Sequence, residues 1–331
     1  MTDQVLTSVP STKVSLKAKL AFAVSGLGRM AGSTLISAYA IFYYTTVMGL
    51  NGAIVGTIIL ISKIWDVIND PMMGVLCDRT KSKEGKCRFW LKHFSVPGGV
   101  ILALMFMIPD LTTPLQYAWL AVTYILQSMA HTALGIPANA LMGRLTTDPV
   151  ERSKINQYNM IFSVAGTYAA IGLTMPLVTM IGGDNMKFGF FIVGIVVGVI
   201  YALSFLVAWA GTKGCEPLEY LAADYSEDTG EKNKEDVSVF SSLKALLPNT
   251  HWFLCIGIML AYVTSGGLEQ ASMVQYYMYN LGNTNLVSLY STISLVALIL
   301  GLLCMNLFVK WFRFLYKGII INHNKNRANL H

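Results

Sequence analysis

Three ionisable side chains interrupt an otherwise apolar stretch of the sequence, Gly52 to Leu76. At 100° per residue, Lys63, Asp66 and Asp70 fall within an arc of about 60° on one face of a helix. A charge at the depth of a bilayer costs roughly 2.5–3.5 kcal/mol even on the insertion scale, so such groups usually line a polar pathway and have partners. We therefore expect this face to carry the chemistry of the protein.

The two aspartates are suited to binding a small cation. Asp66 and Asp70 are four residues apart, a spacing at which like charges on a helix repel each other unless a cation or a proton lies between them. Asn69 adds an amide, and Pro71, which lacks an N–H, leaves the backbone carbonyl of Val67 as a further oxygen. The pattern predicts a site for Na⁺, with Asp66 and Asp70 as the metal ligands, or for H⁺.

Two basic residues lie close enough in the sequence to interact with this pair. Lys63 is three residues from Asp66, and Arg29 is the basic residue inside the preceding apolar segment. In one interpretation, Arg29 and Lys63 neutralise the aspartates in a structural ion-pair network. In the other, the aspartates bind a coupling cation, and the basic residues exchange partners as it comes and goes. The residues alone leave both interpretations open.

The composition is that of a polytopic membrane protein. Hydrophobic residues make up 54% of the chain and charged residues 13%, and the mean hydropathy is +0.53, whereas about a quarter of a soluble protein is charged. We expect an all-α protein with eight segments long enough to cross about 30 Å of hydrocarbon. These segments are residues 20–48, 52–76, 89–109, 115–143, 157–181, 188–211, 251–279 and 285–309.

The basic residues predict the orientation of these segments. Nearly all lysines and arginines outside the apolar segments fall in alternate connections, and only Lys187 falls on the other side. By the positive-inside rule, both termini are cytoplasmic and the chain spans the cell membrane several times. The net charge of +6 is then a signal of topology, and we expect membrane lipid and no nucleic acid as a partner.

The chain divides into four parts. Residues 1–211 are predicted to form a six-helix bundle, residues 212–249 a polar cytoplasmic loop, residues 250–312 the first two helices of an incomplete second bundle, and residues 313–331 an aberrant polar cytoplasmic tail. Two bundles with a substrate cavity between them are typical of transporters. The second bundle appears cut short.

Four motifs carry a resemblance to a known family. They are Lys63 to Leu91 (KIWDVINDPMMGVLCDRTKSKEGKCRFWL), Tyr43 to Leu50 (YYTTVMGL), Gly135 to Leu141 (GIPANAL) and Thr147 to Tyr158 (TDPVERSKINQY). Together they resemble the glycoside-pentoside-hexuronide:cation symporters of the major facilitator superfamily. The resemblance implies a twelve-helix fold, of which about eight helices are present, and cation-coupled symport of a sugar or glycoside by alternating access. It also implies that Asp66, Asp70 and Thr132 contribute to the cation site.

The chain departs from the melibiose-transporting members of that family. Met30 and Gly135 stand where those members have carboxylates, which makes a galactoside doubtful and leaves sodium and proton as alternative coupling ions. Asn139, Gln157, Asn159 and, more weakly, Glu269 are the candidate substrate-binding residues.

Other features have secondary roles. Gly194 and Gly198 predict close helix packing, the basic segment Arg79 to Arg88 predicts a cytoplasmic latch, and His131 an interhelical hydrogen bond. The five cysteines form no metal or disulfide pattern, and no catalytic motif occurs, so we expect neither a cofactor nor an enzyme. The alternative function is a truncated, non-transporting fragment or a membrane scaffold, and the oligomeric state is not predicted.

Overall fold

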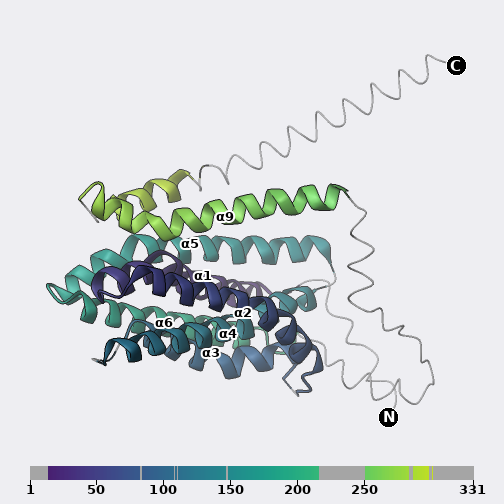
Figure 1. Cartoon of the computed structure of the whole chain (residues 1–331). Helices are drawn as coiled ribbons and strands as arrows, with labels where there is room; N and C mark the ends of the chain where they lie inside the picture. Colours follow the sequence, from purple (N-terminus) through teal and green to yellow (C-terminus); the bar gives the residue numbers. More distant parts are fainter. Residues whose placement is uncertain are drawn as a thin grey trace, which may run out of the picture.

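The computed structural model describes residues 14–82, 84–107, 109, 111–146, 148–215, 250–282, 286–297 and 300, and every regular element within them is a helix. The long helices lie side by side in one bundle (Figure 1). Their bounds are α1 Leu16–Phe42, α2 Gly52–Arg79, α3 Lys86–Met105, α4 Thr113–Leu145, α5 Pro149–Gly182, α6 Met186–Gly211 and α9 Thr250–Tyr279, and a π-helical turn, η1 Tyr43–Val47, extends α1. A shorter apolar helix, Leu286–Ala297, follows α9.

These helices confirm the all-α prediction, and their positions agree with the predicted segments. The largest difference is α5, which begins at Pro149 and not at residue 157. Proline is well tolerated in the first turn of a helix, and Glu151 in that turn interacts favourably with the helix dipole. A hydropathy window excludes this polar first part, although it is helical.

Three of the described helices are apolar and long enough to cross a membrane by length and composition alone. They are α2, residues Glu151–Gly182 of α5, and α6. The most apolar stretches of membrane-spanning length in these helices can be compared by the share of their residues that is buried: this share is 17% in α2, the lowest of the three, and 44% in α6. Most of the surface of α2 is therefore not covered by the described helices.

Local sequence signals account for the helix starts. The side chains of Ser15, Asn51 and Asn185 accept hydrogen bonds from backbone N–H groups in the first turns of α1, α2 and α6, which satisfies donors that have no partner inside the helix. The turns before α2 and α3 contain Gly49 at φ 71° and Gly85 at φ 104°. These positive φ values are conformations that glycine adopts at no steric cost.

The helix α1 is the centre of the bundle, since it packs against α5, α6 and α9. Three buried tyrosines fix its C-terminal end and η1, because their hydroxyls donate to backbone carbonyls of neighbouring segments. Tyr39 donates to Ile171 O at 2.6 Å, and Tyr43 and Tyr44 donate to Phe106 O and Met105 O at 2.9 Å each. Such bonds satisfy the polar end of a large buried side chain.

The close packing predicted for Gly194 and Gly198 is confirmed, and the partner is α3. A Cβ atom at Gly198 would collide with the backbone carbonyl of Gly99, and one at Gly99 would collide with that of Gly198. A Cβ at Gly194 would stand 3.1 Å from the Phe106 side chain. Small residues allow two helix backbones to approach this closely.

The helix ends that the sequence assigns to the cytoplasm meet at one end of the bundle. An ion pair joins Lys19, in the first turns of α1, to Glu151 of α5, and Asp78 of α2 lies 3.9 Å from Arg144 of α4. The segment between α2 and α3 is tied to α6, because Glu84 accepts hydrogen bonds from Lys92 at 2.5 Å and from the Trp209 indole at 2.9 Å. The basic segment therefore has a defined contact within the bundle, and its role as a latch stays a prediction.

The boundaries of the predicted parts stay predictions. Residues 216–249 and 301–331, which include most of the predicted loop and the whole predicted tail, lie outside the described residues.

Candidate functional site

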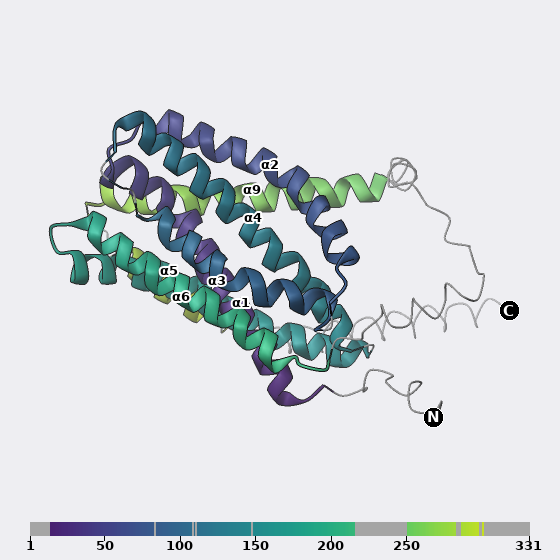
Figure 2. The ribbon, with the colours of Figure 1, turned by 90° about the horizontal axis from the view of Figure 1, so that it is seen from below.

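The predicted aspartates lie between α2 and α4, where each accepts a hydrogen bond from a hydroxyl group of α4. Thr132 Oγ1 donates to Asp70 Oδ1 at 2.9 Å, and Ser128 Oγ donates to Asp66 Oδ1. Figure 2 shows α2 at the edge of the bundle, with α4 beside it. The predicted association of Asp70 with Thr132 is thus present as a direct contact.

The two carboxylates differ in their charge partners. Lys63 Nζ lies 3.1 Å from Asp66 Oδ2, and the Lys63 side chain is 60% exposed while that of Asp66 is 21% exposed. Asp70 is exposed and forms no ion pair with any residue that the structure describes. Both oxygens of Asp66 are therefore engaged, whereas Asp70 keeps an oxygen that a cation could use.

The buried amide of Asn69 supports a polar interior at this depth. Asn69 is 4% exposed, and its Nδ2 atom has no hydrogen-bond partner within the described residues. Gln127, adjacent to Ser128, is 2% exposed, and neither its Nε2 nor its Oε1 has one. Buried amide groups without partners are rare, and these two identify the α2–α4 interface as a place where a ligand or water could bind.

His131 connects the aspartates electrostatically to the second basic residue. It interacts with the charges of Arg29, Lys63, Asp66 and Asp70. The described residues offer it no hydrogen bond, so the interhelical hydrogen bond predicted for His131 is absent there. The cation site and the region around Arg29 therefore share one electrostatic environment.

Arg29 does not pair with either aspartate. Among the described residues it forms no ion pair, so the interpretation in which Arg29 neutralises Asp66 and Asp70 in an ion-pair network is corrected. Instead, Arg29 lines a polar cavity of about 70 Å³ between α1, α4 and α5. Helical geometry explains the difference, because the direction of a long side chain on α1 cannot be read from its spacing to residues of α2.

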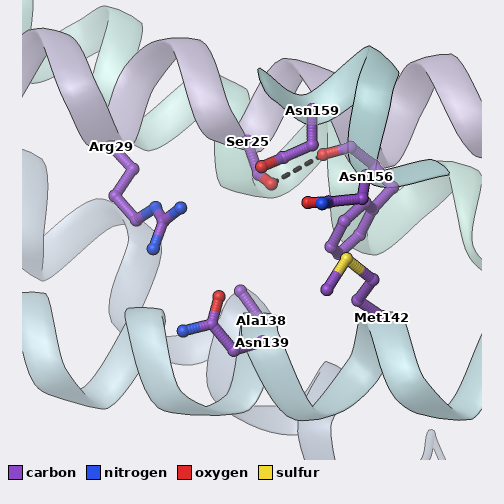
Figure 3. Close-up of a pocket in the computed structure, with 8 residues that line it drawn as sticks. Ser25, Arg29, Ala138, Asn139, Met142, Asn156 and Asn159 are labelled. Carbon is purple, nitrogen blue, oxygen red and sulfur yellow. Dashed lines mark hydrogen bonds between the residues drawn. The ribbon is translucent and has the colours of Figure 1, made fainter. Parts of the chain in front are cut away.

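The cavity brings together two of the predicted substrate-binding residues. It is lined by Phe22, Ser25, Arg29, Ala138, Asn139, Met142, Asn156 and Asn159. Figure 3 shows the side chains of Arg29, Asn139 and Asn156 pointing into the same space from three helices. A guanidinium and three carboxamides offer both donors and acceptors, which is the equipment that hydroxyl groups of a polyol require.

The other two predicted substrate-binding residues are elsewhere. Gln157 is exposed and does not line the cavity, whereas its neighbour Asn156 does. Glu269 of α9 is exposed and accepts a hydrogen bond from Tyr290. The structure therefore does not bring Gln157 or Glu269 together with Asn139 and Asn159.

Three site residues were missed in the sequence. Ser128 is four residues before Thr132, so helical spacing from the predicted threonine could have identified it. Asn156 is three residues before Asn159 and shares its face of α5 for the same reason. Ser25 donates to Phe22 O at 2.6 Å within its own helix, and no sequence signal distinguishes it from other serines in apolar helices.

The donor set of the α2–α4 site favours a monovalent cation. The described residues contain no cluster of three or more His, Cys, Asp or Glu side chains that could hold a metal ion. The oxygens available are those of two carboxylates and two hydroxyls. With Lys63 present, the ionised groups carry a net charge of −1, which one Na⁺ or one H⁺ would neutralise.

Comparisons with known proteins extend over most of the chain. A family model described as MFS/sugar transport protein matches residues 21–313. The isoprimeverose transporter of Lactiplantibacillus pentosus is 30% identical over 269 residues, 80% of this chain and 53% of that protein. In Escherichia coli K12, the inner membrane symporter YicJ is 36% identical over 54% of this chain and 39% of its own length. From the same organism, the protein named "putative glycoside/cation symporter YagG" is 28% identical over 88% of this chain and 61% of its own length. The matches thus cover between 39% and 61% of the length of these three relatives.

Proposed function

This chain belongs to the glycoside-pentoside-hexuronide:cation symporter family of the major facilitator superfamily, a family of multi-pass membrane proteins, and we propose that it takes part in cation-coupled uptake of a sugar or glycoside by alternating access. The relatives named after transport of isoprimeverose and after glycoside/cation symport support both halves of this proposal.

One observation carries the cation half. Two carboxylates lie at membrane depth on α2, each contacts a hydroxyl of α4, and a single ammonium group compensates one of their two charges. In a purely structural ion-pair network both carboxylates would have a charge partner, whereas Asp70 is exposed and has none among the described residues. A site with a net charge of −1 is instead prepared for a monovalent cation.

The polar cavity supports the sugar half. Its volume of about 70 Å³ is smaller than the 300–1,000 Å³ of typical ligand pockets, so a sugar fits only after α1, α4 and α5 separate. Alternating access provides such a change, since the cavity opens and closes on each cycle. His131 lies near the charges of both sites, and any influence of cation binding on sugar binding is reciprocal.

The ends of the helices support a location in the cell membrane with both termini in the cytoplasm. The basic connections around Arg79–Arg88 and Arg144–Lys154 gather at the end of the bundle where α1 begins. Lys187, in the first turn of α6, lies at the opposite end of that helix from Trp209, which contacts the α2–α3 connection. We propose the division into a bundle of residues 1–211, a cytoplasmic loop of residues 212–249, two further helices within 250–312 and a polar tail of 313–331 on the same grounds.

Uptake measurements test the proposal. The chain is expressed in cells that lack sugar symporters, and uptake of radiolabelled isoprimeverose, xylosides and glucuronides is measured in Na⁺ or choline buffers, with and without a pH gradient. We expect one sugar class to accumulate in a cation-dependent manner, and Asp70→Asn to abolish that dependence. Absence of uptake with every sugar and gradient, in membranes that contain the folded chain, would reject the proposal.

A further inference from the structure

We propose that Ser128 is a ligand of the cation site and that its hydroxyl adapts this site to Na⁺ in preference to H⁺. The inference rests on the proposed function, because it takes Asp66 and Asp70 to be the cation-binding carboxylates. It goes beyond that function by assigning a residue that no motif identified and by choosing between the two coupling ions.

Ser128 and Thr132 occupy equivalent places in one repeated arrangement. Ser128 bonds to Asp66 and Thr132 to Asp70, and each pair is separated by 62 residues. The same offset over two successive helical turns means that α2 and α4 run parallel here, with both hydroxyls on one face of α4. The geometry therefore gives Ser128 the same access to the site as Thr132.

A serine hydroxyl can serve both a carboxylate and a cation. It has one hydrogen to donate, which Asp66 receives, and two lone pairs that remain available as acceptors. A hard cation requires several oxygen ligands around it, and the hydroxyls of Ser128 and Thr132 increase the number that the two carboxylates provide. A proton binds to a single carboxylate oxygen and does not require several oxygen ligands around it.

The described residues around Thr132 provide few other oxygens that could bind a cation. A Cβ atom at Gly135, one turn after Thr132, would meet no heavy atom within 4 Å outside its own helix. The described helices thus leave open space one turn after Thr132, and Gly135 offers no side-chain oxygen there. Ser128, one turn before Thr132 on α4, supplies an additional oxygen at the contact between α2 and α4.

Sodium binding to the purified full-length chain in detergent tests this assignment. Radioactive Na⁺ is titrated at constant ionic strength with choline chloride, and protonation of the aspartates is followed separately by infrared absorption in sodium-free buffer. We expect Ser128→Ala to weaken Na⁺ binding at least about tenfold, the usual effect of removing a group around a metal, while proton binding is retained. Ser128→Thr, which keeps the hydroxyl, restores most of the sodium affinity.

Two controls separate a ligand from a structural role. Ser204→Ala removes a buried hydroxyl that, among the described residues, bonds to Tyr201 O of its own helix at 2.8 Å, and it leaves Na⁺ binding unchanged. Circular dichroism and size-exclusion chromatography verify that each variant is folded. If Ser128→Ala loses sodium and proton binding equally, or if Ser128→Thr fails to restore sodium binding in a folded protein, Ser128 is not a ligand.

The failure of this inference can be told apart from the failure of the proposed function. If Asp70→Asn loses Na⁺ while Ser128→Ala binds it as the unmodified chain does, the aspartate site stands and the assignment of Ser128 is overturned. If the unmodified chain binds no Na⁺ but its aspartates titrate, the sodium preference is overturned and proton coupling remains. If neither ion binds at Asp66 and Asp70, the proposed function fails together with the inference.

Discussion

At the scale of single residues, the two carboxylates of the site differ in the partners that they have. Asp66 has a hydroxyl and an ammonium as partners, whereas Asp70 has a hydroxyl only among the described residues. The Lys63 side chain is 60% exposed, so few contacts with the described residues hold its ammonium beside Asp66. Its ammonium can therefore move away from Asp66 at low cost when a cation arrives.

The polar cavity gives a prediction with a matched control on the same helix. Asn159→Ala removes a carboxamide that lines the cavity, while Gln157→Ala removes an exposed one two residues away. Loss of one hydrogen bond to a sugar corresponds to about 0.5–1.5 kcal/mol, so we expect the half-saturation concentration for uptake to rise about three- to tenfold in Asn159→Ala only. Equal effects of the two substitutions would show that this cavity does not bind the sugar.

The sequence predicted which polar residues form the site better than it predicted which residues they contact. The spacing of Lys63, Asp66 and Asp70 indicated one face, and the structure places Asp66 and Asp70 against α4 as the assignment of Thr132 implied. The position of Arg29 could not be predicted, because it depends on the rotation of α1 relative to α4 and α5. Gln157 and Asn156 differ by 100° on a helix, so only Asn156 of these two neighbours lines the cavity, and the sequence alone does not determine which of them does.

At the scale of helices, α3 and α6 approach each other closely because both carry a glycine at their contact. We expect Gly198→Ala to reduce the free energy of unfolding by about 1–3 kcal/mol, the usual cost of forcing extra atoms into a packed interface. The new methyl group would meet the carbonyl of Gly99. Gly56→Ala on α2, where a Cβ meets nothing within 4 Å, should not lower stability, since alanine favours a helix more than glycine does. Thermal unfolding in detergent measures both, and an unaffected Gly198→Ala protein would contradict the predicted contact.

The connection between α2 and α3 makes stability depend on pH. A hydrogen bond from Lys92, and a smaller contribution from Trp209, hold the pKa of Glu84 below its ordinary value. A carboxyl with a lower pKa in the folded state stabilises the fold above its ordinary pKa of about 4.3, and this contribution disappears as the pH falls through the folded value. We expect the difference in melting temperature between the unmodified chain and Glu84→Gln to be largest near neutral pH and to vanish in acid. A constant difference would show that Glu84 acts through packing alone.

At the scale of the whole molecule, polar contacts collect at one end of the bundle. Ion pairs and charged hydrogen bonds connect the start of α1 to that of α5, α2 to α4, and the α2–α3 connection to α6. The sequence predicted which connections share a side of the membrane, because positive charge alone determines that assignment. It did not predict the partners, since the acids that receive these charges lie on other helices.

Labelling of single cysteines tests the orientation. In a variant whose native cysteines are replaced by serine, Lys81→Cys and Asp184→Cys place a thiol at opposite ends of the bundle, each at an exposed position. We expect a membrane-impermeant maleimide to label Asp184→Cys in intact cells and Lys81→Cys only after the membrane is permeabilised. The reverse pattern would contradict cytoplasmic termini.

The marginal position of α2 has a mechanical consequence. This helix packs mainly against α4, and two hydrogen bonds between hydroxyls of α4 and carboxylates of α2 cross that interface. An ion coordinated by oxygens of both helices would replace these hydrogen bonds with its own coordination bonds. Ion binding and release would then change the strength of the contact between α2 and α4, so that the occupancy of the site controls how freely α2 can move relative to α4.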